Sequence, residues 1–251
     1  MADTAIEEMQ SILDENGLQT VVTSGSAVTQ GALREQFTDA DLLHLHGHTA
    51  GHDLERHLVL EREGRSASSR SPVSAAQYTA RTGISPFLSL SEVQQASQER
   101  MQRFTLQDAF AVTVRARLVM LMGCGSGIQV IREGDDALGL VNAFLSAGAT
   151  SVMSTLWPLD QTDAANFSKE FYRNMFASAD DVIDLATAFQ SSVNLMRACR
   201  RPGCQRKRPS ARLQCHRVAP YHWAPFTLSG SWVCQGIAAR TRDEMLPATP
   251  I

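Results

Sequence analysis

The chain has 251 residues, 43% of them apolar, so it can bury the core of one large domain or two small ones. Its 23 basic and 26 acidic side chains give a net charge of −3, which excludes a general attraction to nucleic acid or to anionic membranes. Five cysteines at irregular spacing do not resemble the disulfide framework of a small secreted domain. No run approaches the ~20 apolar residues of a membrane span. We therefore expect a cytoplasmic protein with neither a membrane nor a nucleic-acid partner.

The first part of the chain predicts helices and strands in turn. Apolar side chains recur at helical spacing up to Gly17, which predicts a first helix that ends at this glycine. We expect a strand at residues 20–23 and a second helix over residues 26–37. The sequence DADLLHLHGHT then predicts an apolar strand that opens onto a turn rich in Gly and His. A brief strand is expected at residues 57–60.

The second part predicts a parallel sheet. After a Ser-rich stretch at residues 61–103, expected to be an inserted loop, Thr105 and Asp108 stand at nearly capping-box spacing before a helix. The run RLVMLMGCGSG is typical of a strand that is buried on both faces and breaks into a glycine-rich turn. A helix and a strand follow, then helices at residues 160–176 and 181–197. This alternation predicts an α/β fold with a mostly parallel sheet.

The predicted domain covers residues 1–234, and residues 235–251 form a C-terminal tail. A strongly basic stretch at residues 197–217 contains no acidic residue, and we expect it to be an inserted, solvated loop. Its cysteines match none of the paired-cysteine zinc patterns. The sequence WAPFTLSGSW then predicts a closing strand.

Reactive side chains stand at the ends of two predicted strands. One strand delivers His44, His46 and His48, and the other delivers Cys124. In open α/β sheets the carboxyl ends of neighbouring parallel strands meet at one edge, where ligands bind. A cysteine attacks as its thiolate, and a nearby histidine can take the thiol proton and later protonate a leaving amine. Backbone N–H groups at a glycine-rich turn can stabilise the oxyanion.

Two other interpretations of these residues are open. A lone cysteine on an apolar strand is most often a small buried hydrophobe. Histidines at spacing two share one face of a strand, so His44, His46 and His48 could hold a zinc ion together with His52. However, Gly47 stands where the His-x-His-x-Asp-His pattern of metallo-β-lactamase-like hydrolases requires an aspartate. The metal-dependent hydrolase is therefore the weaker hypothesis, and we expect no cofactor.

Four blocks of the sequence can be compared with known families: LLHLHGHT, LMGCGSG, GDDALGLVNAFLSAGATSVMSTLWPLDQTDA and YHWAPFTLSG. Together they resemble the CHAT family of caspase- and separase-like cysteine peptidases. The run LLHLHGHT resembles the family's strand that ends in His-x-x-Gly-His-Gly, and LMGCGSG resembles its Ser-Ala-Cys-x-Thr-Gly. The run GDDALGLVNAFLSAGATSVMSTLWPLDQTDA is similar to the segment after the family's cysteine, and YHWAPFTLSG to its final strand. The blocks follow the family's order, and outside the two insertions the resemblance extends from the first helix to Gly230.

This resemblance implies a caspase-like three-layer sandwich and a cysteine endopeptidase. The implied catalytic residues are Cys124 and His48, and the implied oxyanion donors are the backbone N–H groups of Cys124 and of Thr49, where the family usually has Gly. Related peptidases use acidic groups to select Arg or Lys before the scissile bond, which implies substrate binding by Asp160 and Asp163. The same two aspartates also suit the start of a helix.

The expected partners are a protein substrate and a repeat-domain regulator, such as tetratricopeptide repeats on a longer chain. Family members have a strand before the first helix, and this sequence shows none. We therefore expect a gap in the sheet, or repair by upstream sequence, between residues 20–23 and the strand that carries the histidines. The missing strand and Thr49 favour the main alternative, an inactive pseudoenzyme that serves as a protein-interaction or signalling module.

Overall fold

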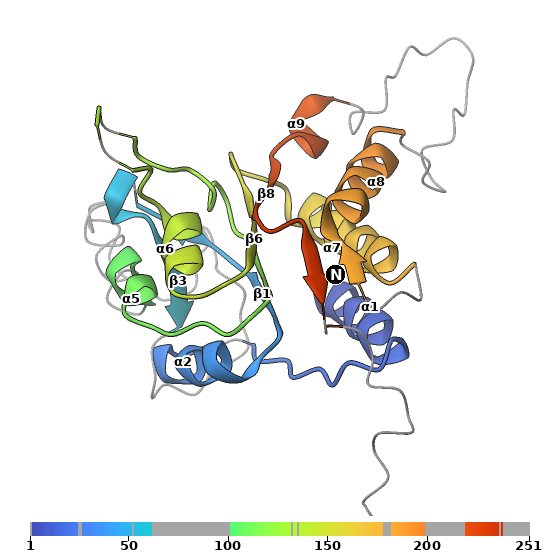
Figure 1. Ribbon diagram of the computed structural model, residues 1–251, viewed down its shortest axis with the longest axis horizontal. Coiled ribbons are helices and arrows are strands. Elements are labelled where there is room, and N and C mark those ends of the chain that lie inside the picture. Colours follow the sequence, from blue (N-terminus) through green and yellow to red (C-terminus); the bar gives the residue numbers. More distant parts are fainter. Residues whose placement is uncertain are drawn as a thin grey trace, which may run out of the picture.

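A four-stranded sheet with the order β1-β5-β6-β8 forms the middle layer of the fold (Figure 1). The computed structural model describes residues 2–24, 27–51, 53–61, 101–131, 133–134, 136–177, 182–198, 219–235 and 237. The strands of the sheet are β1 (Leu42–His46), β5 (Leu118–Met122), β6 (Ser151–Thr155) and β8 (Phe226–Gly230). The first three are parallel, and β8 runs antiparallel to β6. The predicted α/β class with a mostly parallel sheet is confirmed.

Strand β5 joins the two halves of the core because all of its residues are buried. Leu118, Met120 and Met122 face one side of the sheet, and Val119 and Leu121 face the other. The alternation follows from the twofold repeat of a strand. A strand with two apolar faces needs a layer of helices on each side.

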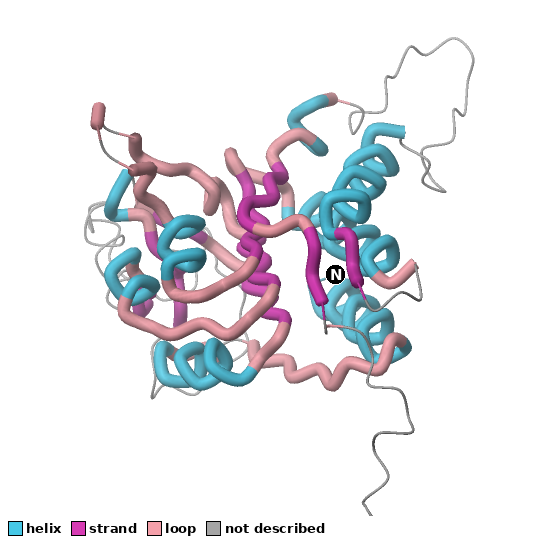
Figure 2. Tube along the Cα trace, viewed as in Figure 1, coloured by secondary structure: helices cyan, strands magenta, loops and turns pink. Residues whose placement is uncertain are grey.

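Two groups of helices supply these layers, seen on opposite sides of the strands in Figure 2. One face is covered by α1 (Ala2–Glu15), α7 (Gln161–Met175) and α8 (Leu185–Ala198). The other is covered by α2 (Gln30–Asp39), α5 (Leu106–Phe110) and α6 (Leu140–Ser146). The expected three-layer sandwich is confirmed. A short helix, α9 (Pro220–Trp223), precedes β8.

Two smaller sheets lie beside the main one. The first is formed by β2 (Thr49–Ala50), β3 (His57–Glu61) and β4 (Met101–Phe104), and a 3-10 turn, η2 (Asp53–Glu55), lies between β2 and β3. The second pairs β7 (Val182–Asp184) with β9 (Val233–Gln235). Both are antiparallel.

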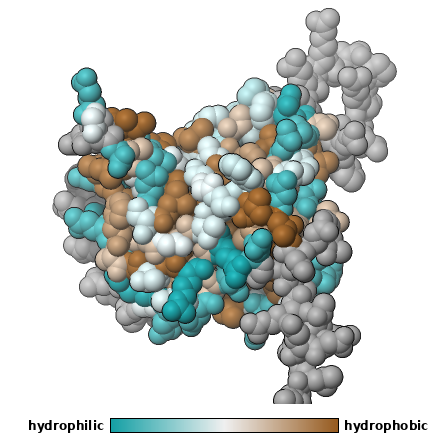
Figure 3. Space-filling model, in the orientation of Figure 1, coloured by the Kyte–Doolittle hydropathy of each residue, from teal (hydrophilic) through white to brown (hydrophobic). Residues whose placement is uncertain are grey.

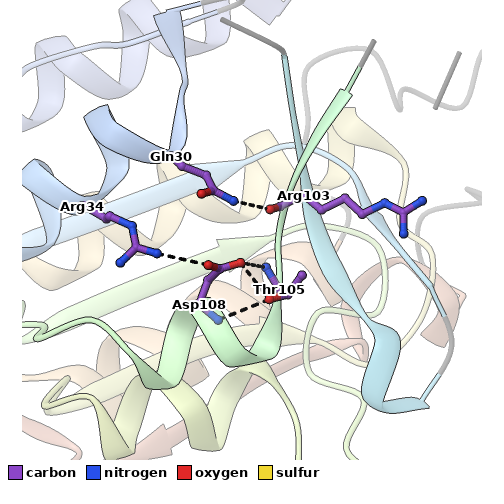
Figure 4. A network of polar contacts seen from close by, with 5 residues as sticks. All are labelled: Gln30, Arg34, Arg103, Thr105 and Asp108. Carbon is purple, nitrogen blue, oxygen red and sulfur yellow. Dashed lines mark hydrogen bonds and ion pairs between the residues drawn. The ribbon is translucent and has the colours of Figure 1, made fainter. Parts of the chain in front are cut away.

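The predicted cap of α5 is confirmed and connects three elements (Figure 4). Thr105 and Asp108 form a reciprocal capping box, although Asp replaces the usual Glu or Gln. The Asp108 carboxylate also lies 3.1 Å from Arg34 of α2. The Gln30 side chain donates a hydrogen bond to the backbone oxygen of Arg103 on β4. These contacts fix α2 against the smaller sheet, next to the segment that leads into β1.

Three predictions differ from the structure. Strand β4 takes up the last three residues of the predicted loop at residues 61–103, and β7 occupies the start of the predicted helix at residues 181–197. Residues 20–23 have no ladder partner among the described residues, and Val21 and Val22 are 69% and 47% exposed. Strand formation needs a neighbour as well as β-branched residues. Among the strands that the structure describes, β1 lies at the edge of the sheet, and residues 20–23 do not pair with it.

The bounds of the remaining predictions are tested only in part. The second helix begins at Gln30, with Thr29 as its cap, and not at residue 26. Residues 62–100, 199–218 and 238–251, which hold most of the two predicted insertions and the tail, lie outside the described ranges. No helix in the described ranges is both long and apolar enough to cross a membrane. On the face seen in Figure 3, apolar residues lie in separate patches among polar ones.

Candidate functional site

The reactive histidine and cysteine come from neighbouring parallel strands at matching positions. His46 pairs with Met122 at the carboxyl ends of β1 and β5. His48 and Cys124 each follow two residues later, so both lie just beyond the same edge of the sheet. The two side chains line one cavity of about 70 Å³, together with His46, Gly47, Met122, Leu159, Gln161 and Ala164. This volume is far below the ~300–1,000 Å³ of small-molecule sites.

The turn that carries Cys124 is held by hydrogen bonds from β6. Thr155 is fully buried, and its hydroxyl donates to the Gly123 oxygen at 2.5 Å and accepts from the Gly125 N–H at 3.1 Å. The Ser126 hydroxyl donates to the Leu121 oxygen at 2.6 Å and accepts from the Thr155 N–H. These contacts place the turn independently of any bound molecule. Sequence analysis missed Thr155, whose role depends on the pairing of β5 with β6.

Thr49 joins the histidine turn to the cysteine turn. Its hydroxyl donates to the backbone oxygen of Cys124. A Cβ added to Gly123 would lie 2.7 Å from the Thr49 Cγ2 and 3.6 Å from the Thr49 nitrogen. Only glycine therefore allows the two turns to approach so closely, and the backbone N–H of Thr49 lies beside the strand end that carries Cys124.

His44 is turned away from the cavity and into the core. Its Nδ1 lies 2.7 Å from the hydroxyl of Tyr172, a fully buried residue of α7. Its Nε2 is also buried and has no partner among the described residues. Burial, followed by the charge of His46, lowers the pKa of His44 from 6.5 to about 3. His44 is therefore neutral at physiological pH, and it shares one hydrogen bond with the Tyr172 hydroxyl.

His46 lies between His44 and the cavity. Its ring centroid is 5.9 Å from that of His44. Desolvation of the ring, followed by the proximity of His48, lowers the pKa of His46, although the residue as a whole is exposed.

The arrangement does not favour the zinc hypothesis. His44 is bonded to Tyr172, and His52 lies outside the described residues. Within the described ranges, no three His, Cys, Asp or Glu side chains are grouped to hold a metal ion.

The two predicted substrate-binding aspartates are engaged within the fold. Asp160 is the N-cap of α7, and its carboxylate accepts from the Thr162 N–H at 2.7 Å. Asp163 is buried, and its Oδ2 lies 2.5 Å from Nδ1 of His222 on α9. Neither residue lines the cavity. The structure thus supports the helix-cap interpretation of Asp160 and leaves substrate binding by either residue a prediction.

The chain is similar to a known family and to a solved structure. The family model described as the CHAT domain matches residues 2–231. Among curated proteins, none is significantly similar. A solved structure of the separase–securin complex from Saccharomyces cerevisiae is similar at 19% identity and a TM-score of 0.35, over 50% of this chain and 7% of that chain. The match to the family model covers nearly the whole chain and agrees with the four blocks in the sequence, and the chain therefore belongs to the CHAT domain family.

Proposed function

We propose that the chain is a cysteine endopeptidase in which Cys124 is the nucleophile and His48 is its general base. The observation that carries the proposal is that both side chains line one cavity at the ends of adjacent parallel strands. The small cavity suits part of a peptide better than a cofactor. Membership of the CHAT family supports the same chemistry.

Hydrolysis of the peptide bond proceeds through proton transfers between Cys124, His48 and the leaving amine. His48 takes the proton from the Cys124 thiol, and the thiolate sulfur attacks the carbonyl carbon of the scissile bond. When the tetrahedral intermediate collapses, the C–N bond breaks and the amine leaves with the proton held by His48. Water, activated by the same imidazole, then hydrolyses the thioester and returns Cys124 to its thiol.

The oxyanion of the intermediate requires donors that are already in place. We assign this role to the backbone N–H groups of Cys124 and Thr49. The hydrogen bonds of Thr155 hold one turn, and the contact of Thr49 with the Cys124 oxygen holds the other against it. Thr49 replaces the family's usual glycine but retains the amide that the role needs.

We also propose the class of the substrate and of the regulator. The substrate is a protein, and a repeat-domain regulator on a longer chain would control access to Cys124. Selection of Arg or Lys by Asp160 and Asp163 would require one of these carboxylates to exchange its present partner for substrate.

The first test is covalent labelling of the purified chain with iodoacetamide and with an acyloxymethyl ketone probe. We expect labelling at Cys124 that is absent in Cys124→Ala, falls in His48→Ala and persists in EDTA. His46→Ala is the matched control, because His46 lines the same cavity at the neighbouring strand position. Labelling should survive this substitution.

Three outcomes would replace the proposal. If labelling falls in His46→Ala and not in His48→Ala, the base is misassigned. If Cys124 in the folded wild type reacts no faster than a free thiol, the chain is a pseudoenzyme that keeps the fold for protein contacts. Loss of hydrolysis in EDTA, with activity kept in Cys124→Ala, would favour the metal-dependent hydrolase.

A further inference from the structure

A basic side chain that the reaction above does not use lies against the turn of Cys124. Arg56 stands between η2 and β3, at the tip of the hairpin formed by β2 and β3. Its Nη1 lies 3.2 Å from the position that a Cβ would take on Gly125, the residue after Cys124. Gly125 has a left-handed φ of +64° and no side chain, which lets the guanidinium approach the backbone.

The guanidinium lacks a counter-charge in the described part of the chain. No described carboxylate forms an ion pair with Arg56, and its Nε is buried without a hydrogen-bond partner there. A buried donor on a charged group that makes no hydrogen bond is destabilising. An anion that bonded to the guanidinium would supply the missing counter-charge, because Arg presents a planar set of donors that matches a carboxylate.

We propose that Arg56 forms an anion subsite beside Cys124 that binds a carboxylate of the substrate. The carboxylate comes from an acidic side chain next to the scissile bond or from a C-terminus close to it. The inference rests on the proposed function for its substrate, and it differs from the basic preference implied by the family resemblance. The two aspartates assigned to that preference already have partners in the fold, whereas the guanidinium at the cysteine turn has none among the described residues. Arg56 does not line the cavity of Cys124 and His48, so the subsite lies beside that cavity and not within it.

The first experiment measures the subsite without requiring peptidase activity. Iodoacetate and iodoacetamide alkylate a thiolate by the same step, in which sulfur bonds to the methylene carbon and iodide leaves. They differ in that iodoacetate carries a carboxylate. Peptide mass spectrometry in alkaline buffer gives the rate at which each reagent alkylates Cys124. The iodoacetate rate is divided by the iodoacetamide rate, and this ratio is then divided by the same ratio for glutathione. The normalised ratio reports the preference for an anion.

We expect the normalised ratio to be well above one in the wild type and to fall by about tenfold in Arg56→Gln, because a charge-assisted hydrogen bond is lost. Arg56→Lys should retain part of the ratio, since the charge remains without the planar fork. Arg103→Gln is the matched control, because Arg103 lies on the same small sheet and its guanidinium points away from the polar contacts in Figure 4. It should leave the ratio unchanged.

A measurement on the wild type alone guards against a variant that does not fold. Added sodium chloride should lower the ratio, because salt screens the attraction. A normalised ratio of one in the wild type, or a high ratio that is unchanged in Arg56→Gln, would overturn the subsite even if the dyad is active. Conversely, a high ratio with no dependence of labelling on His48 would support the subsite and reject the peptidase.

Peptide substrates then identify the source of the carboxylate. Peptides with Glu or with Gln next to the scissile bond, each with a free or an amidated C-terminus, form a set of four. If Glu is preferred over Gln in the wild type but not in Arg56→Gln, the ligand is an acidic side chain. If only the free C-terminus matters, the ligand is a terminal carboxylate. Equal cleavage of all four peptides would overturn the proposed selectivity.

Discussion

The contact between His44 and Tyr172 predicts a specific loss of stability in acid. In the folded chain the pKa of His44 is lowered to about 3 from an ordinary value of 6.5, chiefly by burial. Between these two values the unfolded chain binds a proton that the folded chain does not. The contribution of His44 to the free energy of unfolding is therefore complete above pH 6.5 and is lost as the pH falls toward 3.

The size of the effect follows from the same two values. Between the two pKa values, each unit by which the pH falls lowers the free energy of unfolding by up to about 1.4 kcal/mol. Integration from about pH 7.5 to about pH 5.5 gives a loss of at most about 1.4 kcal/mol from His44 alone. The residue as a whole is only partly buried, although both ring nitrogens are shielded, so solvent screening makes this an upper bound.

The test compares wild type with His44→Gln by urea unfolding at several pH values. Glutamine does not titrate, and its amide can either donate to or accept from the Tyr172 hydroxyl. The fall in the free energy of unfolding toward acid pH should therefore be shallower by up to about 1.4 kcal/mol per pH unit. Tyr172→Phe is the control: it leaves the His44 nitrogen unpaired and should lower stability by about 1–3 kcal/mol at every pH, with the slope retained. A wild-type slope that persists in His44→Gln would refute the reasoning.

Three further outcomes are expected. Thr155→Val leaves the Gly125 N–H without its partner, so it should lower stability by about 1–3 kcal/mol and slow iodoacetamide labelling of the cysteine turn in the folded protein; an unchanged labelling rate would contradict this role. Gly125→Ala should cost about 1 kcal/mol or more, because alanine is disfavoured at a φ of +64°, and a neutral effect on thermal melting would be evidence against this backbone conformation. Asp163→Asn should lower the melting temperature by several degrees, through loss of about 1–3 kcal/mol in its buried contact with His222; a loss of cleavage after Lys or Arg with unchanged melting would instead support a substrate-binding aspartate.

Much of the architecture was predictable because it depends on local patterns. The alternation of apolar strands and amphipathic helices gave the α/β class, and the continuous run at Leu118–Met122 gave a strand with two buried faces. The capping box of Thr105 and Asp108 was predictable because its donor and acceptor are three residues apart. The failed strand at residues 20–23 has the right residues but no neighbour among those described. The short strands β7 and β9 were missed because each is defined mainly by its partner.

By itself, the sequence determined which residues are chemically able to act and at which strand ends they stand, since motifs and periodicity are properties of neighbouring positions. Only the tertiary structure decided which of them meet. The order of the strands brought His48 and Cys124 to one cavity, and packing of α7 on β1 turned His44 to Tyr172, 128 residues away. Packing of α9 on α7 gave Asp163 a partner, and a hairpin tip set Arg56 against the cysteine turn. Such contacts join distant segments, and their positions follow from how the layers of the core pack together.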